Sequence, residues 1–224
     1  MSHTLGVRQA QKQKTRQALM DAGLHLLEEQ SLSSLGLREV TRVVGVSPAA
    51  FYRHFRDMGD LGVALVEESL ESLHTMIRAT LAEQDDAEAR IDRTVDLIAE
   101  YVRHHGPHVR FIARERHGGV RPVREAIAAE LDRFSEEVAS ALAVQTVSDG
   151  WSREDIRMLA GLYVDHMVMT AAAFLEALAV EPGGDRSATE ASEAEQRIAR
   201  TARLARRQLR LVSLGRLHWK DGDK

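Results

Sequence analysis

The stretch LREVTRVVGVSPAAFYRHF, from Leu37 to Phe55, contains two helical patterns separated by a short break, and it decides the fold. Apolar residues in its first half recur at helical spacing and share one face. Gly45 can take the left-handed conformation that ends a helix. Ser47 followed by Pro48 is typical of a new helix, because serine caps the free N–H groups and proline fits the first helical position. The stretch therefore predicts a helix-turn-helix whose second helix runs from Pro48 to about Phe55.

The second helix of this motif has the composition of a helix that reads DNA. Small residues at its start allow close approach to a major groove, and the Tyr, Arg and His that follow can reach phosphates. Basic residues before the motif and on its first helix can add phosphate contacts. The predicted DNA-binding residues are Lys14, Arg38, Arg42, Ser47, Pro48, Ala49, Ala50, Tyr52, Arg53 and His54.

The run from Gly45 to Pro48, followed by FYRHF at 51–55 and Leu61, resembles the N-terminal domain of TetR-family transcriptional regulators. The resemblance implies an all-α, TetR-like fold. Residues 1–56 would form a three-helix helix-turn-helix DNA-binding domain, and residues 57–224 a helical ligand-binding and dimerisation domain. The family pattern usually has a threonine where this chain has Gly36, and often a lysine where it has Met58, so two phosphate contacts are in doubt.

Three further segments resemble the FabR/DesT group of repressors of unsaturated fatty-acid synthesis. They are YRHFRD at 52–57, RERHG at 114–118 and LRLVSLGRLHW at 209–219. This resemblance implies a repressor of lipid-metabolism genes whose effector is a long-chain acyl-CoA or a similar hydrophobic molecule. The alternative is a TetR-type repressor of an efflux or catabolic operon with a different small hydrophobic ligand. A third possibility is an activator or architectural DNA-binding protein without a ligand.

The charge of the chain is divided unevenly along its length. The net charge is −4, yet residues 1–56 hold eight Lys and Arg against four Asp and Glu, so the remainder carries about −8. A basic N-terminal part on an acidic body is expected where only one end meets DNA phosphates. The chain has no cysteine, and we expect neither a signal peptide nor an apolar run of membrane-spanning length. We therefore expect a cytoplasmic protein without membrane contact.

The rest of the chain reads as helices. The first helix is expected at 12–30, preceded by a polar segment that is either a basic arm beside DNA or a tail. Asp57 caps a long helix to about residue 83, and further helices are expected near 87–105, 107–117, 120–145, 152–180 and 190–217. Breaks fall at Gly106-Pro107 and Gly118-Gly119, and a loop is expected at 181–187.

The last two helices are expected to form a homodimer through a four-helix bundle, which would space two motifs for a palindromic operator on double-stranded DNA. The side chains predicted to form this surface are Leu159, Leu162, His166, Ala173, Ala177, Ile198, Leu204, Leu211 and Leu214. Packing within one chain remains the alternative.

A hydrophobic effector would bind among the middle helices. Apolar and aromatic side chains there suit an acyl chain, although the same residues could be ordinary core. The predicted ligand-binding residues are Phe111, Arg114, Phe134, Tyr163, His166, Met167 and Phe174.

Catalysis and metal binding are not expected. The sequence has no glycine-rich phosphate loop and no framed carboxylate pair, so we expect no enzyme activity. His104, His105 and His108 stand beside a Gly-Pro break that scatters their side chains, so we expect no metal and no resident cofactor.

Overall fold

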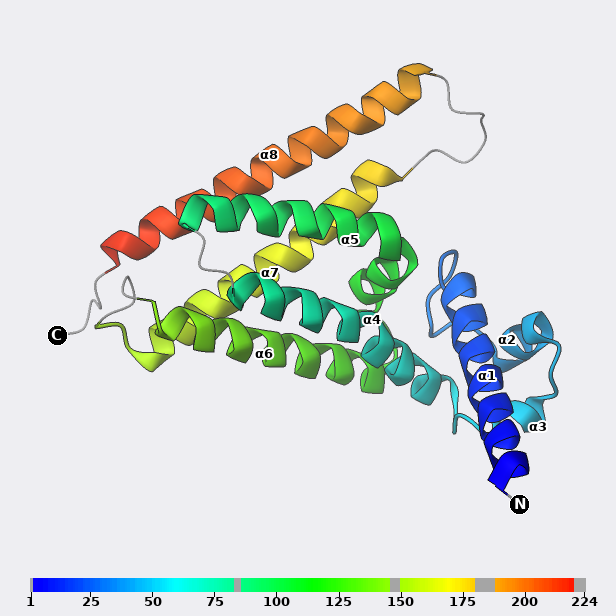
Figure 1. Cartoon of the computed structure of the whole chain (residues 1–224). Coiled ribbons are helices and arrows are strands. Elements are labelled where there is room, and N and C mark those ends of the chain that lie inside the picture. The colour runs from blue at the N-terminus through cyan, green and yellow to red at the C-terminus, as the bar shows by residue number, and fades with distance from the viewer. Residues whose placement is uncertain (1, 83–85, 146–149, 180–187, 220–224) are drawn as a thin grey trace. The chain divides into compact units, whose positions relative to one another are not determined.

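The computed structural model describes residues 2–82, 86–145, 150–179 and 188–219, and these residues form eight α-helices and no β-strand (Figure 1). The helices are α1 Ser2–Leu26, α2 Leu37–Val44, α3 Pro48–Phe51, α4 Met58–Ala82, α5 Ala87–Glu115, α6 Arg121–Ala143, α7 Arg153–Leu178 and α8 Ala188–His218. The all-α fold class is confirmed. The loop predicted at 181–187 lies outside the described residues.

The chain divides into two compact units. The first unit comprises Met1–Glu71 and Arg110–Ala128, and the second comprises Ser72–Val109 and Ala129–Lys224. The first unit is thus larger than the domain predicted to end at residue 56, because it also holds the start of α4, the end of α5 and the start of α6. Helices α4, α5 and α6 each contribute residues to both units.

The core of the first unit is built around the helix-turn-helix. Large apolar side chains from α1, α2, α3, α4 and the segment between α3 and α4 are at most 2% exposed in it: Leu19, Val40, Phe51, Phe55, Leu61 and Leu65. Gly62 allows α4 to approach two other segments closely, since a Cβ there would lie 2.4 Å from Leu32 Cδ2 and 2.6 Å from Val123 Cγ2. The start of α6 and the loop after α1 therefore pack directly on α4.

The N-terminal helix is longer than predicted. It begins at Ser2 and ends at Leu26, so the segment expected to be an arm or tail is helical. Between residues 7 and 16 the chain has no proline or glycine and is rich in Gln, Lys and Arg, which favour helix. The predicted cap of α4 is confirmed, because the Asp57 carboxylate accepts a hydrogen bond from the Asp60 N–H at 2.8 Å.

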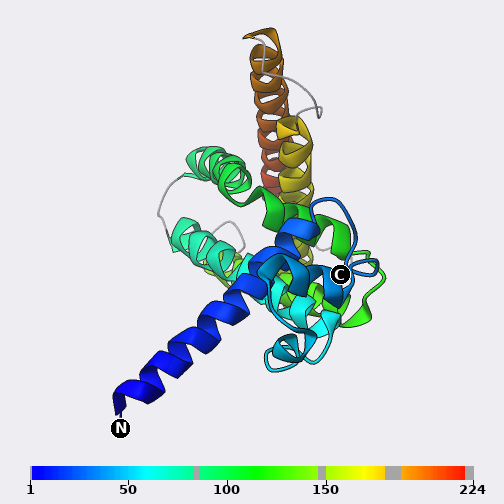
Figure 2. The ribbon, with the colours of Figure 1, turned by 90° about the vertical axis from the view of Figure 1, so that its right-hand side faces the viewer.

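In the second unit, α7 and α8 lie side by side in both views (Figures 1 and 2). Its core contains α5, α7 and α8 side chains, namely Val95, Ile98, Ala99, Val102, Phe174, Ala205 and Leu209. Arg206 of α8 also binds two carboxylates of α5, with distances of 2.9 Å to Asp92 and 2.6 Å to Asp96. These contacts join α8 to α5.

The break predicted at Gly106-Pro107 is a kink within α5 rather than a gap between helices. His105 has φ −125° and ψ 30°, outside the helical region, and Pro107 follows inside the helical span. Proline cannot donate to the preceding turn and its ring crowds the carbonyl four residues earlier, which explains the kink. The helices predicted at 87–105 and 107–117 are therefore two arms of α5.

Apolar side chains remain exposed on α7 and α8. The most exposed are Met158, Leu162, Met169, Leu204, Leu211, Leu214 and Leu217, which are 52–70% accessible. The expectation was wrong for Leu159 and Ala177, which are buried, whereas Ile198 is partly buried against the second unit's core and its place in a dimer stays a prediction. They face their own chain because α7 and α8 pack on each other and on α5.

Helix α7 also corrects the expectation that no segment has the length and hydropathy of a membrane span. An 18-residue window within Arg153–Leu178 has a mean hydropathy of 1.5. Length and composition of this kind also occur in the packed helices of proteins that never enter a membrane.

Candidate functional site

The turn between α2 and α3 has the geometry that the sequence predicts. Gly45 has φ 74° and ψ 30°, in the left-handed region, and its N–H donates to the Arg42 carbonyl at 3.3 Å. The Ser47 side chain accepts a hydrogen bond from the Ala50 N–H at 3.3 Å, and Pro48 occupies the first turn of α3. The predicted capping roles of Gly45, Ser47 and Pro48 are confirmed.

The start of α2 keeps one half of a capping box, although Gly36 has no side chain to supply the other half. The Glu39 carboxylate reaches back and accepts a hydrogen bond from the Gly36 N–H at 2.9 Å. This bond, together with one from Gln30, holds the pKa of Glu39 below its usual value. One free N–H at the helix start, that of Gly36, is therefore satisfied by the Glu39 side chain.

Two buried aromatic rings orient the second helix of the motif. Phe51 and Phe55 are 0% and 2% exposed, with ring centroids 5.5 Å apart. Helix α3 ends at Phe51, earlier than predicted, but the backbone continues in turns, since the Phe55 N–H donates to the Phe51 carbonyl at 3.0 Å. With these rings facing the core, Tyr52 points outward and is 62% exposed.

The predicted DNA-binding residues all belong to the first unit, and most are exposed. Ala50 and His54 are half-buried, whereas the other eight are exposed: Lys14, Arg38, Arg42, Ser47, Pro48, Ala49, Tyr52 and Arg53. Their side chains are thus accessible to a duplex, and their contacts with DNA stay a prediction.

His54 differs from its neighbours because its ring is half-buried. Burial lowers the pKa of His54, and the positive charges of Lys12, Arg16 and Arg53 lower it further. The ring is therefore neutral near pH 7 in the absence of DNA. Because the charges of Lys12 and Arg16 act on His54, these two residues of α1 lie near the second helix of the motif. Sequence spacing did not predict this grouping.

The end of α5 holds the turn that follows α1. The Arg114 guanidinium donates hydrogen bonds to the carbonyl oxygens of Leu27, Gln30 and Glu28, at 2.9, 2.7 and 3.3 Å. A cation is well placed just beyond the C-terminal end of α1, where the helix dipole is negative.

The neighbouring Glu115 binds the same loop. It is 1% exposed and accepts a hydrogen bond from the Leu32 N–H at 2.9 Å. Gly118 leaves room for this carboxylate, since a Cβ there would lie 2.1 Å from Glu115 Oε2. Two neighbouring residues of α5 thus hold one loop. Arg114 donates to its carbonyl oxygens, and Glu115 accepts from one of its N–H groups.

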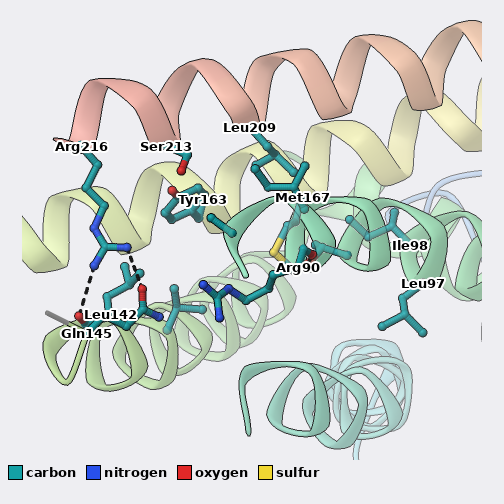
Figure 3. A pocket seen from close by; sticks show the side chains of 14 residues that line it. Arg90, Leu97, Ile98, Leu142, Gln145, Tyr163, Met167, Leu209, Ser213 and Arg216 are labelled. Atoms are coloured by element: carbon teal, nitrogen blue, oxygen red, sulfur yellow. Dashed lines mark hydrogen bonds between the residues drawn. The ribbon is translucent and has the colours of Figure 1, made fainter. Parts of the chain in front are cut away.

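A cavity of about 130 Å³ lies within the second unit, between α5, α6, α7 and α8 (Figure 3). Most of the side chains that line it are apolar, and a few are polar or charged. The lining residues are Ala87, Arg90, Ile91, Thr94, Leu97, Ile98, Val138, Leu142, Gln145, Tyr163, Met167, Leu209, Ser213 and Arg216. A mainly apolar cavity with a few polar groups is the usual form of a small-molecule site.

Only part of the predicted ligand-binding set lines this cavity. Tyr163 and Met167 do, and both come from α7. The other five lie elsewhere. Phe111 is buried in the first unit, and Arg114 binds the turn after α1. In the second unit, Phe134 stacks on His74 with ring centroids 3.7 Å apart, Phe174 belongs to the core, and His166 lies near Ala205 and Thr170. Burial lowers the pKa of His166 below its usual value.

The cavity contains charged residues that the sequence reasoning missed. Arg90 and Arg216 both line it, together with Gln145. They come from α5 and α8 and are far apart in the chain, so local periodicity carried no signal for them. An arginine in the closing FabR/DesT-like segment, Arg216, was the one available hint.

In the described part of the chain, no group of three His, Asp or Glu side chains is arranged to hold a metal ion. The histidines near the α5 kink are instead involved in ring contacts, with Tyr101 and His105 stacked at 4.5 Å and His105 and His108 edge to face at 5.9 Å.

The first unit thus exposes a helix-turn-helix, and the second contains a mainly apolar cavity. Residues 19–65 match the model of the family described as bacterial regulatory proteins, tetR family. A Haemophilus influenzae protein described as an uncharacterized HTH-type transcriptional regulator is 38% identical over 139 residues, covering 62% of this chain and 68% of that protein. The chain belongs to the TetR family of bacterial transcriptional regulators, and is a DNA-binding regulator rather than an enzyme.

Solved structures agree with this fold. The fatty acid degradation regulator FadR from Bacillus halodurans is similar with a TM-score of 0.62 and 12% identity, covering 86% of this chain and 94% of that one. FadR from Bacillus subtilis in complex with stearoyl-CoA has a TM-score of 0.60 and 13% identity, with coverage of 82% and 97%. At these identities the similarity establishes the fold alone.

Proposed function

We propose that this protein is a cytoplasmic, homodimeric repressor of lipid-metabolism genes, including those of unsaturated fatty-acid synthesis, and that a long-chain acyl-CoA or a similar hydrophobic molecule controls it. The observation that carries the proposal is the mainly apolar cavity among α5 to α8, in a chain whose other unit is a DNA-binding motif. An acyl chain suits such a lining, because each buried methylene contributes about 0.8 kcal/mol.

The fold neighbours support a lipid effector. Two of them are named as fatty-acid regulators, and one was solved with stearoyl-CoA. The FabR/DesT-like segments of this chain point in the same direction, and one of them, at 209–219, contributes Leu209, Ser213 and Arg216 to the cavity.

Dimerisation would occur through α7 and α8. Leu162, Leu204 and Leu211 are 52%, 57% and 70% exposed, although apolar side chains of this size favour burial. Two copies of the α7–α8 pair would form a four-helix bundle and cover these side chains. Sedimentation velocity checks this directly: the wild-type chain should sediment as a dimer, and Leu211→Glu should shift it towards the monomer.

Helix α5 would transmit the effector's presence. Its first part contributes Arg90 and Ile98 to the cavity, and its last residues, Arg114 and Glu115, hold the loop after α1. The kink at His105 lies between these two parts. An effector that displaces the first arm would therefore change the support of the DNA-binding motif through the second arm of the same kinked helix.

A second candidate is a repressor of an efflux or catabolic operon that responds to a smaller hydrophobic ligand. The size of the cavity favours it, since about 130 Å³ is below the roughly 300–1,000 Å³ of pockets that hold drug-sized ligands. A long acyl chain would have to push the helices apart, which would itself couple binding to a change of shape.

The experiment that separates these candidates measures operator binding in the presence of effectors. A binding duplex is first selected from a random pool, and its anisotropy is then followed while palmitoyl-CoA, oleoyl-CoA or coenzyme A alone is added. Opposite effects of the saturated and unsaturated thioesters, with no effect of coenzyme A, support the lipid proposal. Indifference to both thioesters refutes it, and release by small aromatic or terpenoid compounds then supports the second candidate.

A further inference from the structure

The outer part of α1 carries a row of basic side chains on one face. Arg8, Lys12 and Arg16, the basic row, follow one another at intervals of four residues, which places them on the same side of the helix over about 12 Å. Residues 1–20 hold four Lys and Arg in all and no Asp or Glu. No carboxylate in this part of the sequence therefore offsets the positive charge of the row.

The face that carries the basic row changes character along the helix. Leu19 continues this face and is 0% exposed, and at Gly23 a Cβ would lie 3.0 Å from Leu61 Cδ2, so the inner part packs on α4. Residues 7–14, in contrast, are all exposed, and Figure 2 shows this half of α1 extending beyond the other helices of the first unit. A mostly polar helical segment without a buried face gains no stabilisation from core packing. This segment is therefore available to a partner outside the chain, and its charge suits an anionic one.

Arg16 is the point where the basic row meets the motif. Its guanidinium lies 5.0 Å from the centre of the Phe55 ring, just beyond the second helix of the motif. Its charge also lowers the pKa of Asp60 at the start of α4. These contacts place Arg16 against the first unit, so Lys12 and Arg8 are the members of the row that reach outward.

Two parts of the first unit gather positive charge around the half-buried ring of His54. The charges of Lys12, Arg16 and Arg53 each lower the pKa of His54, so all three lie near its ring. Lys12 belongs to α1 and Arg53 lies in the turns after α3, and both side chains are exposed. Like charges on one exposed surface repel one another, and the phosphates of a duplex lying over them would relieve this repulsion. The basic row is therefore continuous with the surface on which the motif would meet DNA.

We propose that the outer part of α1 is a second DNA-contacting surface, on which Arg8 and Lys12 bind phosphates beside those met by the second helix of the motif. Lys14, the α1 lysine that the sequence predicts to bind DNA, lies roughly 200° around the helix from Lys12, so the phosphate contact is assigned to Lys12 instead. Contacts with phosphates hold a protein on every duplex and do not select a sequence. The inference rests on the DNA binding of this family and not on the proposed effector.

The test measures DNA binding by the full chain, without effector, between about 50 and 200 mM salt. A duplex selected from a random pool is titrated by fluorescence anisotropy, and a duplex of scrambled sequence is titrated beside it. The variants are Arg8→Gln, Lys12→Gln and the two combined. Lys14→Gln removes the same charge from the other face of α1. Arg203→Gln is the remote control, because Arg203 is exposed and belongs to α8 in the second unit.

Arg8→Gln and Lys12→Gln should each reduce the slope of log affinity against log salt by about 0.9 for each bound subunit, because each removes one phosphate contact. The reduction should be the same on the selected and the scrambled duplex. Lys14→Gln should reduce the slope clearly less than Lys12→Gln, and Arg203→Gln should not change it. Glutamine is a good helix former at exposed positions, so far-UV circular dichroism of each variant should match the wild type.

Duplexes that carry one neutral methylphosphonate in place of a phosphate, moved along both strands, locate the contacts. At the linkages bound by Arg8 and Lys12, the neutral group should weaken binding of the wild type but not of the double variant, since that contact is already lost. At the linkages bound by the motif, the two proteins should lose affinity equally.

The outcomes separate this inference from the proposed function. An unchanged salt slope in the double variant, or equal losses for Lys14→Gln and Lys12→Gln, overturns the inference while DNA binding and the proposed effector stand. Equal sensitivity of the wild type and the double variant at every linkage overturns it as well. Failure of the wild type to bind any duplex would instead refute DNA binding itself, on which the inference and the proposed function both depend.

Discussion

Replacing Arg114 with alanine should destabilise the DNA-binding unit without changing effector affinity. The side chain is half-buried and donates three hydrogen bonds to carbonyl oxygens at the end of α1 and in the following loop. A hydrogen bond from a charged group contributes about 1.5–3 kcal/mol, but bonds that share one side chain are not additive. We therefore expect a loss of about 2–4 kcal/mol in the free energy of unfolding.

Urea denaturation of the full chain followed by far-UV circular dichroism measures this loss. Arg121→Ala is the matched control, because Arg121 is an exposed arginine whose ion-pair partner, Glu125, lies one turn along the same helix. Arg114→Lys should recover only part of the stability, since an ammonium cannot span three carbonyls as a guanidinium does.

The same variants distinguish the structural role of Arg114 from the ligand-binding role that the sequence predicts for it. If Arg114→Ala is as stable as Arg121→Ala but binds acyl compounds much more weakly, the reasoning from the hydrogen bonds is refuted. If stability falls and the affinity of the intact protein is unchanged, Arg114 supports the motif and does not bind effector.

Three other predictions concern the motif and its packing. Gly45→Val should lower stability by about 1–2 kcal/mol in urea denaturation, because φ 74° disfavours any residue with a side chain, and unchanged stability would disprove the turn. Gly62→Ala should lower the free energy of unfolding by about 1–3 kcal/mol, since its Cβ would lie 2.4 Å from a buried carbon of Leu32. Gly161→Ala is the control: its Cβ would have no atom within 4 Å, so the change should be neutral or stabilising, and equal effects of the two changes would argue against the packing. Because the lowered pKa keeps His54 neutral near pH 7, His54→Ala should leave the salt dependence of DNA binding unchanged, whereas Arg53→Ala should reduce its slope by about 1. The lowered pKa also means that His54 takes up a proton more readily in the unfolded chain than in the folded one. The free energy of unfolding should therefore fall as the pH drops below about 6.5, and His54→Gln should make this fall smaller.

The sequence by itself determined the helix-turn-helix. Its signals are local: a glycine that can adopt positive φ, a serine and a proline that start a helix, and apolar residues at helical spacing. Such choices depend on a residue and its near neighbours, so Gly45, Ser47 and Pro48 take the predicted roles. The cap by Asp57 and the break at Gly118-Gly119 were predictable for the same reason.

Tertiary structure alone decided which side chains share a site. Arg90 and Arg216 line one cavity because α5 and α8 pack together, and no local pattern joins residues so far apart in the chain. Arg114, predicted to meet a ligand, instead binds carbonyls that a loop from another segment brings to it. On α7, Leu159 and Leu162 look alike in sequence, yet one is buried and the other exposed. Periodicity defines a face of a helix, but only the packing of the whole chain determines what that face contacts.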